Sequence, residues 1–386
     1  MADRMTPMQP CIVCHDIAIS RGGRTIWSEG TFTIPRGSAT AIVGTNGAGK
    51  TTLMKAELGL IPLSHGTMTV LGKPAGEMNA HIGYVPQSYA SDIDSSLTAE
   101  QSVLLGLTGT RFGFHIISKK ERDKAREAME FVGVLDKAPY RLSQLSGGLR
   151  QRVAIAQALV SDPELLMLDE PLANLDPATG KQTIELIDEI QEKTDTTVVI
   201  IEHRLEDVLW RDVDRIVLMG DGKILADLHP DELLSTRLLE ENGIREPLYL
   251  TALRYAGVEL APAKKPAHVD SVVIDKADRK KMTDWFWSRP AAEAEKEHEP
   301  LLEVRNLTFG YERGRQTLRD VSLTIQKGEM VSIVGKNGAG KSTFSKLVCG
   351  FETPDSGEIL FQGRNLLQEN IRHRAKHIGY VMQNPN

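Results

Sequence analysis

Gly44-Thr-Asn-Gly-Ala-Gly-Lys-Thr51 is the stretch that decides the fold. Its glycines let backbone N–H groups converge on phosphate oxygens, because no Cβ stands in the way. The lysine offers a positive charge to the β- and γ-phosphates, and the last hydroxyl can bind Mg²⁺. A buried strand is expected over 39–43 before it, and a helix over 51–58 after it, with its positive end facing the same phosphates. The stretch therefore predicts a nucleotide-binding α/β domain.

The same motif returns as Gly335-Lys-Asn-Gly-Ala-Gly-Lys-Ser342, 291 residues later (335 − 44). The segment Ile82-Gly-Tyr-Val-Pro-Gln87 also has a counterpart, Ile378-Gly-Tyr-Val-Met-Gln383. Self-similarity of this kind predicts a duplicated domain, in which each phosphate loop follows a strand and opens a helix. We expect a complete first copy over 1–243, a linker over 244–300, and only the N-terminal part of a second copy over 301–386.

Leu165-Leu-Met-Leu-Asp169-Glu170 is the natural partner of the phosphate loop. Its apolar run predicts a buried parallel strand. This strand would deliver Asp169 to a metal ion and place Glu170 where it can polarise an attacking water. The run over 197–201 predicts a second such strand, and the apolar spacing over 179–193 predicts the helix that joins them. With a charged amphipathic helix expected over 119–131, the predicted fold class is α/β, a P-loop NTPase with a helical insertion.

Leu145-Ser146-Gly147-Gly148-Leu149-Arg-Gln-Arg resembles the signature motif of ATP-binding cassette (ABC) ATPases. Gln87 is similar to that family's Q-loop glutamine, Asn174-Leu-Asp176 to its D-loop, and His203 to its switch histidine. The resemblance implies a P-loop NTPase of the ABC type with a helical signature subdomain, duplicated, with ATP and Mg²⁺ as cofactors. It also implies that two such domains pair head to tail, in a homo- or heterodimer. Each ATP would then lie between the phosphate loop of one domain and the signature motif of the other.

Site residues follow from these motifs residue by residue. Catalytic roles are expected for Glu170, His203 and Gln87, and metal contacts for Thr51, Gln87, Asp169, Ser342 and Gln383. The expected nucleotide-binding residues are those of the two phosphate loops, the signature motif and one aromatic residue: Gly44, Thr45, Asn46, Gly47, Ala48, Gly49, Lys50, Thr51, Thr52, Ser146, Gly147, Gly148, Tyr311, Gly335, Lys336, Asn337, Gly338, Ala339, Gly340, Lys341, Ser342 and Thr343.

The aromatic residue is the one on which ABC ATPases usually stack adenine, ahead of the phosphate loop. Tyr311 occupies that place in the second copy. The ungapped offset places Ser20 there in the first copy (311 − 291 = 20). We therefore expect the first site to hold the base less firmly, since such stacking is worth about 1–3 kcal/mol. Trp27 is the alternative stacking residue from nearby.

Two halves of the chain resemble two kinds of importer ATPase. From about Asp169 onward, stretches such as Glu202–Val208 and Arg245–Leu253 are similar to the duplicated ATPase of energy-coupling factor (ECF) vitamin importers. The earlier part, including Val85–Ile93, is similar to ATPases of zinc/manganese-type importers. The sequence thus predicts an ATPase that powers a membrane importer, with ECF-type vitamin or micronutrient uptake favoured and metal-ion uptake next. Its partners would be transmembrane importer subunits, at the cytoplasmic face of the cell membrane.

Composition bears on the alternative, a soluble tandem ABC ATPase that acts on ribosomes or nucleic acid. The 386 residues carry a formal charge of −6 and only 5% aromatic residues, so no nucleic-acid partner is expected. Such proteins would be expected to carry a long basic linker, whereas residues 244–300 are of mixed charge. No apolar run reaches the length of a membrane span, and three cysteines favour a reducing compartment.

Two smaller patterns complete the sequence. Cys11-Ile-Val-Cys14-His15 fits the C-x-x-C-H pattern of haem attachment, but it aligns with the first strand of the repeat, which has no cysteine. We expect ordinary strand residues there. Trp285-Phe-Trp287 is an apolar triplet in polar surroundings. We expect it to anchor its segment on the neighbouring domain, with a partner-docking site as the alternative.

Overall fold

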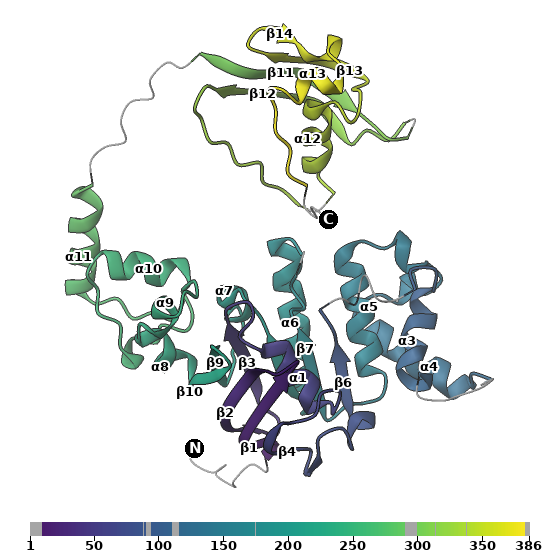
Figure 1. Ribbon diagram of the computed structural model, residues 1–386, viewed down its shortest axis with the longest axis vertical. Coiled ribbons are helices and arrows are strands. Elements are labelled where there is room, and N and C mark those ends of the chain that lie inside the picture. The colour runs from purple at the N-terminus through teal and green to yellow at the C-terminus, as the bar shows by residue number, and fades with distance from the viewer. Residues whose placement is uncertain are drawn as a thin grey trace. The chain divides into compact units, whose positions relative to one another are not determined.

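The computed structural model describes residues 10–87, 89, 94–109, 116–173, 175–289, 299–312, 314–336 and 338–382. The chain divides into two compact units (Figure 1), the first ending at Arg289 and the second beginning at Pro290. None of the described helices is long and apolar enough to cross a membrane.

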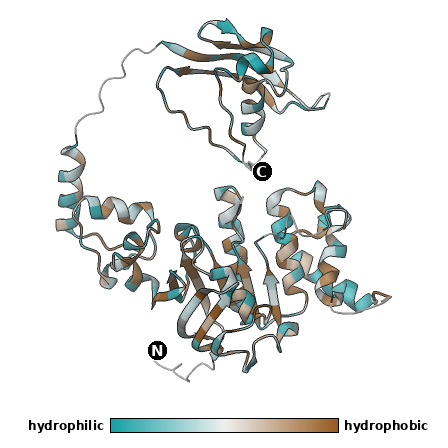
Figure 2. Cartoon of the chain, in the orientation of Figure 1, coloured by the Kyte–Doolittle hydropathy of each residue, from teal (hydrophilic) through white to brown (hydrophobic). Residues whose placement is uncertain are grey.

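A six-stranded sheet forms the centre of the first unit, in the order β10-β9-β3-β8-β7-β6. Its strands are parallel except for the edge strand β10. Every residue of β3, β7 and β8 is buried, which explains their continuous apolar runs. The strand bounds are β3 Ala39–Gly44, β6 Ile82–Val85, β7 Leu165–Asp169, β8 Thr197–Ile201, β9 Arg215–Gly220 and β10 Lys223–Leu228. In Figure 2 these central strands are coloured largely brown.

The two faces of this sheet belong to two hydrophobic clusters, because successive side chains of a strand point to opposite faces. Leu166 and Leu168 pack on one side, and Leu165 and Met167 on the other. The second side is covered by helix α1 and by an antiparallel sheet of order β2-β1-β4-β5. Their bounds are α1 Lys50–Glu57, β1 Pro10–Arg21, β2 Arg24–Pro35, β4 His65–Val70 and β5 Lys73–Pro74. Cys11 and Cys14 are buried free thiols within β1.

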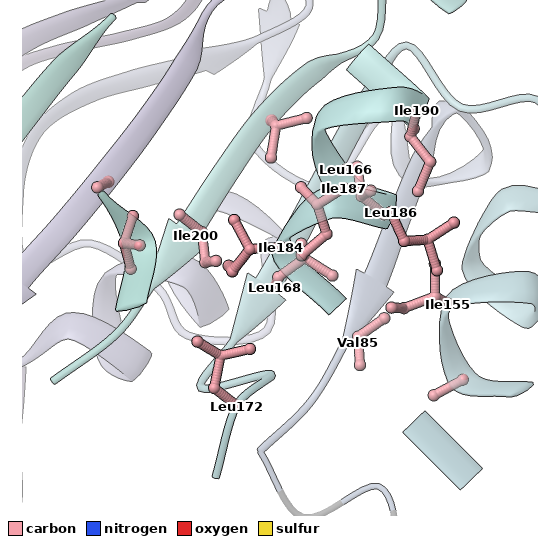
Figure 3. Packing of buried hydrophobic residues seen from close by; sticks show 14 of the residues in the cluster. Val85, Ile155, Leu166, Leu168, Leu172, Ile184, Leu186, Ile187, Ile190 and Ile200 are labelled. Atoms are coloured by element: carbon pink, nitrogen blue, oxygen red, sulfur yellow. The ribbon is translucent and has the colours of Figure 1, made fainter. Parts of the chain in front are cut away.

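Helices cover the first side. Figure 3 shows Ile184, Ile187 and Ile190 of α6 pointing at the central strands, with Ile155 of α5 beside them. The helices are α3 Ala99–Thr108, α4 Lys119–Phe131, α5 Gly147–Leu159, α6 Pro177–Thr194 and α7 Leu205–Val208. The helix expected over 119–131 is confirmed as α4, which begins at a capping box of Ser118 and Glu121. Short 3₁₀ turns lie at Asn79–His81, Leu135–Lys137 and Leu142–Gln144.

The prediction of a linker over 244–300 is wrong for residues 244–289. Leu250 and Leu253 are buried in the same hydrophobic cluster as the central strands. The His268 ring also joins this segment to the body of the unit, with Nδ1 2.8 Å from the Leu209 carbonyl oxygen and Nε2 2.7 Å from Asp212 Oδ1. The mixed composition concealed a helical subdomain that buries some of its apolar residues, such as Leu250 and Leu253, and exposes others, such as Leu248. Its elements are α8 Pro230–Ser235, α9 Leu238–Glu241, α10 Leu248–Tyr255, a 3₁₀ turn Pro262–Lys264 and α11 Lys276–Trp287. Residues 290–298 lie outside the described residues.

The aromatic triplet Trp285-Phe-Trp287 at the end of α11 was expected to be a packing anchor, with a partner-docking site as the alternative. Trp285 packs against the core cluster and stacks on Tyr255, with ring centroids 6.4 Å apart and an interplanar angle of 22°. Phe286 and Trp287 are 61% and 77% exposed. Trp285 is therefore the packing anchor, whereas its two neighbours are surface residues.

The second unit has an antiparallel sheet of order β12-β11-β13-β14 and a helix, α12, that packs against it. Its bounds are β11 Pro300–Phe309, β12 Leu318–Gln326, α12 Lys341–Cys349, β13 Ser356–Phe361, β14 Arg364–Asn365, a 3₁₀ turn Leu366–Gln368 and α13 Ile371–Arg374. The expectation that its phosphate loop follows a strand is wrong, because residues 330–335 form no strand and Met330 is 97% exposed. The matching strand β3 pairs with β8 and β9. No counterpart of these two strands occurs within residues 299–382 as described.

Candidate functional site

The candidate site lies where the parallel strands of the first unit end. The strands β3 and β7 end at Gly44 and Asp169, and β8 is followed directly by the pair Glu202-His203. Neighbouring parallel strands end at one edge of a sheet, so residues far apart in the sequence come together there. Gln87 follows β6 and joins them.

The phosphate loop runs from β3 into α1 around two left-handed glycines, Gly47 with φ 84° and Gly49 with φ 91°. A side chain at Gly49 would lie 2.7 Å from the Trp27 ring, so the loop needs glycine there. Lys50 is buried, and its Nζ donates to the carbonyl oxygens of Gly44 at 2.8 Å and Thr45 at 3.0 Å. Burial lowers the pKa of Lys50, an effect that the carboxylates of Glu170 and Asp169 oppose.

Asp169 and Thr51 form an oxygen pair beside this lysine. The Thr51 hydroxyl donates to Asp169 Oδ1 at 3.1 Å. Asp169 is 1% exposed, and its Oδ2 is buried with no hydrogen-bond partner among the described residues. Burial is the main cause that raises the pKa of Asp169. An unpartnered buried carboxylate oxygen beside a hydroxyl matches the oxygen ligands that Mg²⁺ prefers.

Glu170 is held between two side chains from neighbouring strand ends. Its Oε1 lies 2.5 Å from His203 Nε2, and its Oε2 accepts a hydrogen bond from Gln87 Nε2 at 2.5 Å. The other ring nitrogen of His203, Nδ1, lies 3.2 Å from the Gly44 carbonyl oxygen. Glu170 itself has a left-handed φ of 52°, a conformation that is uncommon outside glycine and clusters at functional sites. The fold thus brings together Glu170, His203 and Gln87, the three residues expected to be catalytic.

Lys50, Thr51, Glu170, His203 and Gln87 line one cavity of about 870 Å³. One part of its wall is the phosphate loop and the residues described above, and another part comes from the β1–β2 hairpin and the β9–β10 turn. The lining residues are Arg21, Thr25, Ile26, Asn46, Gly47, Gly49, Lys50, Thr51, Thr52, Gln87, Glu170, His203, Asp221 and Gly222. The predicted residues Gly44, Thr45, Ala48 and Asp169 are not among the residues that line it.

Glu202, to which no sequence motif pointed, lies between β8 and His203 and contacts the segment after Glu170. This residue is buried, and burial raises the pKa of its carboxyl group to about 7. Its Oε1 accepts from the backbone N–H of Leu172 at 2.7 Å, and its Oε2 from that of His203 at 3.3 Å. It therefore ties the segment after Glu170 to the segment that carries His203. A charged residue directly after a buried strand was the signal that could have found it.

The aromatic alternative for the first copy, Trp27, is wrong, and Ser20 does not line the cavity either. Trp27 is fully buried beneath the phosphate loop and packs on Phe32, so it does not face the cavity. Ser20 is exposed, lies 3.4 Å from the Ser64 hydroxyl, and does not line the cavity. Arg21, which follows it, does.

The signature residues lie apart from this cavity. Ser146 caps α5, and its hydroxyl accepts from the backbone N–H of Leu149 at 3.3 Å. Gly147 and Gly148 open the same helix, whose free N–H groups favour an anion. Because none of the three lines the cavity of its own copy, their contact with a nucleotide stays a prediction about a paired domain.

The second phosphate loop repeats the local geometry of the first. Gly340 has φ 91°, and Lys341 Nζ donates to the carbonyl oxygens of Gly335 at 2.7 Å and Lys336 at 2.8 Å. Thr343 is buried and its hydroxyl lies 3.4 Å from that of Tyr311. The remaining described residues of this set are Gly338, Ala339 and the exposed Ser342, whereas Asn337 and Gln383 lie outside the described residues.

Comparison with known proteins identifies the class. A family model described as ABC transporter matches residues 28–173 and 318–386, and one described as ATP-binding cassette cobalt transporter matches residues 236–309. The chain belongs to the family of ABC transporter ATP-binding proteins. The second match covers most of the helical subdomain after β10, so this subdomain is similar to a family model separate from that of the ATPase domain.

Individual relatives agree with this assignment. The chain is 41% identical over 92% of its length to an ABC transporter ATP-binding protein of Clostridium perfringens, and 43% identical over 92% to one of Enterococcus faecalis. It spans 63% of the length of each of these relatives. Among solved structures, CbiO1 of Clostridium perfringens, described as part of the ABC transporter complex CbiONQ, matches 64% of the chain and 99% of its own, with a TM-score of 0.55 and 25% identity.

Proposed function

We propose that the first unit binds and hydrolyses Mg·ATP, with Glu170 as the general base. The observation that carries this proposal is the position of the Glu170 carboxylate, 2.5 Å from both His203 Nε2 and Gln87 Nε2, in the cavity that the phosphate loop lines. A carboxylate held at both oxygens has a defined orientation, as a base that must align a water requires.

Each residue of the site has a separate role in the proposed reaction. Lys50 and the backbone N–H groups of the loop bind and orient the phosphates. Glu170 accepts a proton from the attacking water, and His203 keeps the carboxylate in place from the neighbouring strand end. Gln87 donates a hydrogen bond to the second carboxylate oxygen and so fixes the orientation of the carboxylate toward the water.

Thr51 and Asp169 are the residues that would hold Mg²⁺. The unpartnered, buried Oδ2 of Asp169 and the hydroxyl beside Oδ1 fit this ion. The ion would neutralise charge that develops on the phosphates. Gln87 and, in the second copy, Ser342 and Gln383 complete the proposed metal contacts.

We further propose that the chain powers an importer of the ECF type, as a peripheral subunit that acts with transmembrane partners and pairs with a second ABC ATPase domain. The description of the match over 236–309 supports a divalent metal such as cobalt as the cargo, ahead of the vitamins that sequence resemblance favoured. The similarity to CbiO1 supports the same transporter type. Uptake of radiolabelled cobalt, lost on deletion of the gene and restored by the wild-type gene, tests this cargo; unchanged uptake in the deletion strain would contradict it.

The hydrolysis step has a direct test in Glu170→Gln. This variant should bind Mg·ATP with unchanged affinity but hydrolyse it at least 100-fold more slowly, because an amide accepts no proton. Glu192→Gln, an exposed carboxylate on α6, is the matched control and should hydrolyse ATP at the wild-type rate. Wild-type turnover by purified Glu170→Gln would show that Glu170 is not the base.

A further inference from the structure

The cavity of the first unit has a wall that the phosphates do not use. In the proposed ATP complex Lys50 and the loop glycines hold the triphosphate, and Gln87, Glu170 and His203 face its reacting end, which leaves one part of the wall for the nucleoside. That wall consists of Arg21, Thr25 and Ile26 of the β1–β2 hairpin together with Asp221 and Gly222 of the β9–β10 turn. The two segments are joined, since Ser28 N–H donates to the Gly222 carbonyl oxygen at 2.8 Å.

The register of the two hairpins shows which residue corresponds to Tyr311. Asp16 and Asn306 mark the same point in each copy: both are left-handed, with φ 50° and 52°, and both backbone N–H groups donate to a hydroxyl of the next strand at 2.9 Å. Further along, Ile19 pairs with Trp27, and Phe309 pairs with Leu318.

The second hairpin is therefore one residue longer than the first (318 − 309 = 9 against 27 − 19 = 8). The extra residue shifts the alignment before the turn. Tyr311, two residues after Phe309, corresponds to Arg21, two residues after Ile19, and not to Ser20. In the first copy the chain turns immediately after Arg21, through Gly22 and Gly23, which both have positive φ.

This hairpin position faces the phosphate loop in both units. The Tyr311 hydroxyl lies 3.4 Å from that of Thr343 in the second unit. In the first unit, Arg21 and Thr52, the counterpart of Thr343, line the same cavity. The register and the cavity lining, two independent observations, thus place Arg21 at the position of Tyr311, on the cavity wall that also includes Thr52.

We infer that Arg21 is the base-stacking residue of the first nucleotide site, with its guanidinium plane on the base. A guanidinium is flat and remains charged at every physiological pH, so it can stack on a purine and also attract its π-electrons. Lysine has no such plane. The first site thus holds the base with a cation where the second copy offers a phenol ring.

This inference rests on the proposed ATP binding by the first unit, and the experiment separates the two. All variants carry Lys341→Ala, which removes the loop charge of the second copy and leaves the first site to be measured. Calorimetry with Mg·ATP should show about tenfold weaker binding for Arg21→Ala, a value within the range of cation–π contacts. Arg21→Lys should resemble Arg21→Ala, and Arg21→Tyr should recover affinity to within about threefold of the parent. Ser20→Ala, the neighbour that does not line the cavity, should leave the affinity unchanged.

Inorganic tripolyphosphate distinguishes a base contact from a phosphate contact, because it carries the charges without the base. Its affinity should be the same for the parent and for Arg21→Ala. Equal loss of tripolyphosphate and ATP affinity would overturn the inference, since Arg21 would then bind phosphate. Undiminished ATP binding by Arg21→Ala would overturn it as well. Failure of the parent to bind ATP at all would instead contradict the proposed function.

Discussion

Glu57 is buried, and no described residue forms a hydrogen bond with its carboxyl group. It lies at the end of α1, the helix that the phosphate loop opens, and is 0% exposed. Both carboxyl oxygens are buried without a hydrogen-bond partner among the described residues. Burial raises the pKa of Glu57 to about 8, so the folded protein keeps this group protonated at neutral pH.

The sign of its effect on stability follows from linkage. The pKa of Glu57 in the folded state lies above its unfolded value, so its stabilising contribution is complete below the unfolded pKa of about 4.3. This contribution is lost as the pH rises through the folded pKa. One pKa unit corresponds to about 1.4 kcal/mol, and the free energy of unfolding should therefore fall by about 3 kcal/mol between pH 5 and pH 7 on account of Glu57.

The perturbation is Glu57→Gln, which carries no titratable proton, and the readout is the difference from wild type. Hydrogen exchange of the α1 amides, followed by mass spectrometry between pH 5 and pH 8, measures the unfolding free energy of this part of the first unit. The stability of Glu57→Gln relative to wild type should rise by about 3 kcal/mol from pH 5 to pH 7. Glu57→Leu should exceed the wild type at pH 7, because it also removes the unpartnered oxygens. Glu77→Gln, an exposed control, should show no such trend. A difference between Glu57→Gln and wild type that stays flat across this range would refute the reasoning.

Three further changes test other parts of the structure. In the Lys341→Ala background, Lys50→Ala should weaken Mg·ATP binding at least tenfold in calorimetry, because it removes the charge-assisted phosphate contact; unchanged binding would remove Lys50 from the site. His203→Ala should slow ATP hydrolysis about 100-fold or more with little effect on ATP affinity, since Glu170 loses the ring at Oε1; normal steady-state turnover would contradict its positioning role. Leu250→Ala should lower the free energy of unfolding of the first unit by about 2–5 kcal/mol in urea titrations, whereas Leu248→Ala, exposed on the same helix, should change it by less than about 1 kcal/mol; equal effects would contradict the packing of α10 on the core.

The local chemistry of the site could be read from the sequence because it depends on short, contiguous patterns. A phosphate loop needs glycines at fixed places for its backbone geometry, and a buried strand before Asp169 and Glu170 is visible as an apolar run. These patterns predicted the central strands β3, β7 and β8, the helix α4, and the residues Lys50, Asp169 and Glu170. The order of the motifs along the chain also led to the correct family.

Only the tertiary structure decided which segments form strands, which residues are buried and how the hairpins pair, because these features depend on residues that are distant in sequence. Residues 330–335 match β3 in sequence but form no strand, since a strand needs hydrogen-bonding neighbours and not only an apolar composition. Residues 244–289 resemble a linker in composition, yet Leu250 and Leu253 complete the core because burial depends on which face an apolar residue occupies. The same reason explains why Arg21, and not Ser20, corresponds to Tyr311. An ungapped count cannot detect one extra residue in a hairpin, whereas the pairing of Phe309 with Leu318 fixes the register through backbone hydrogen bonds.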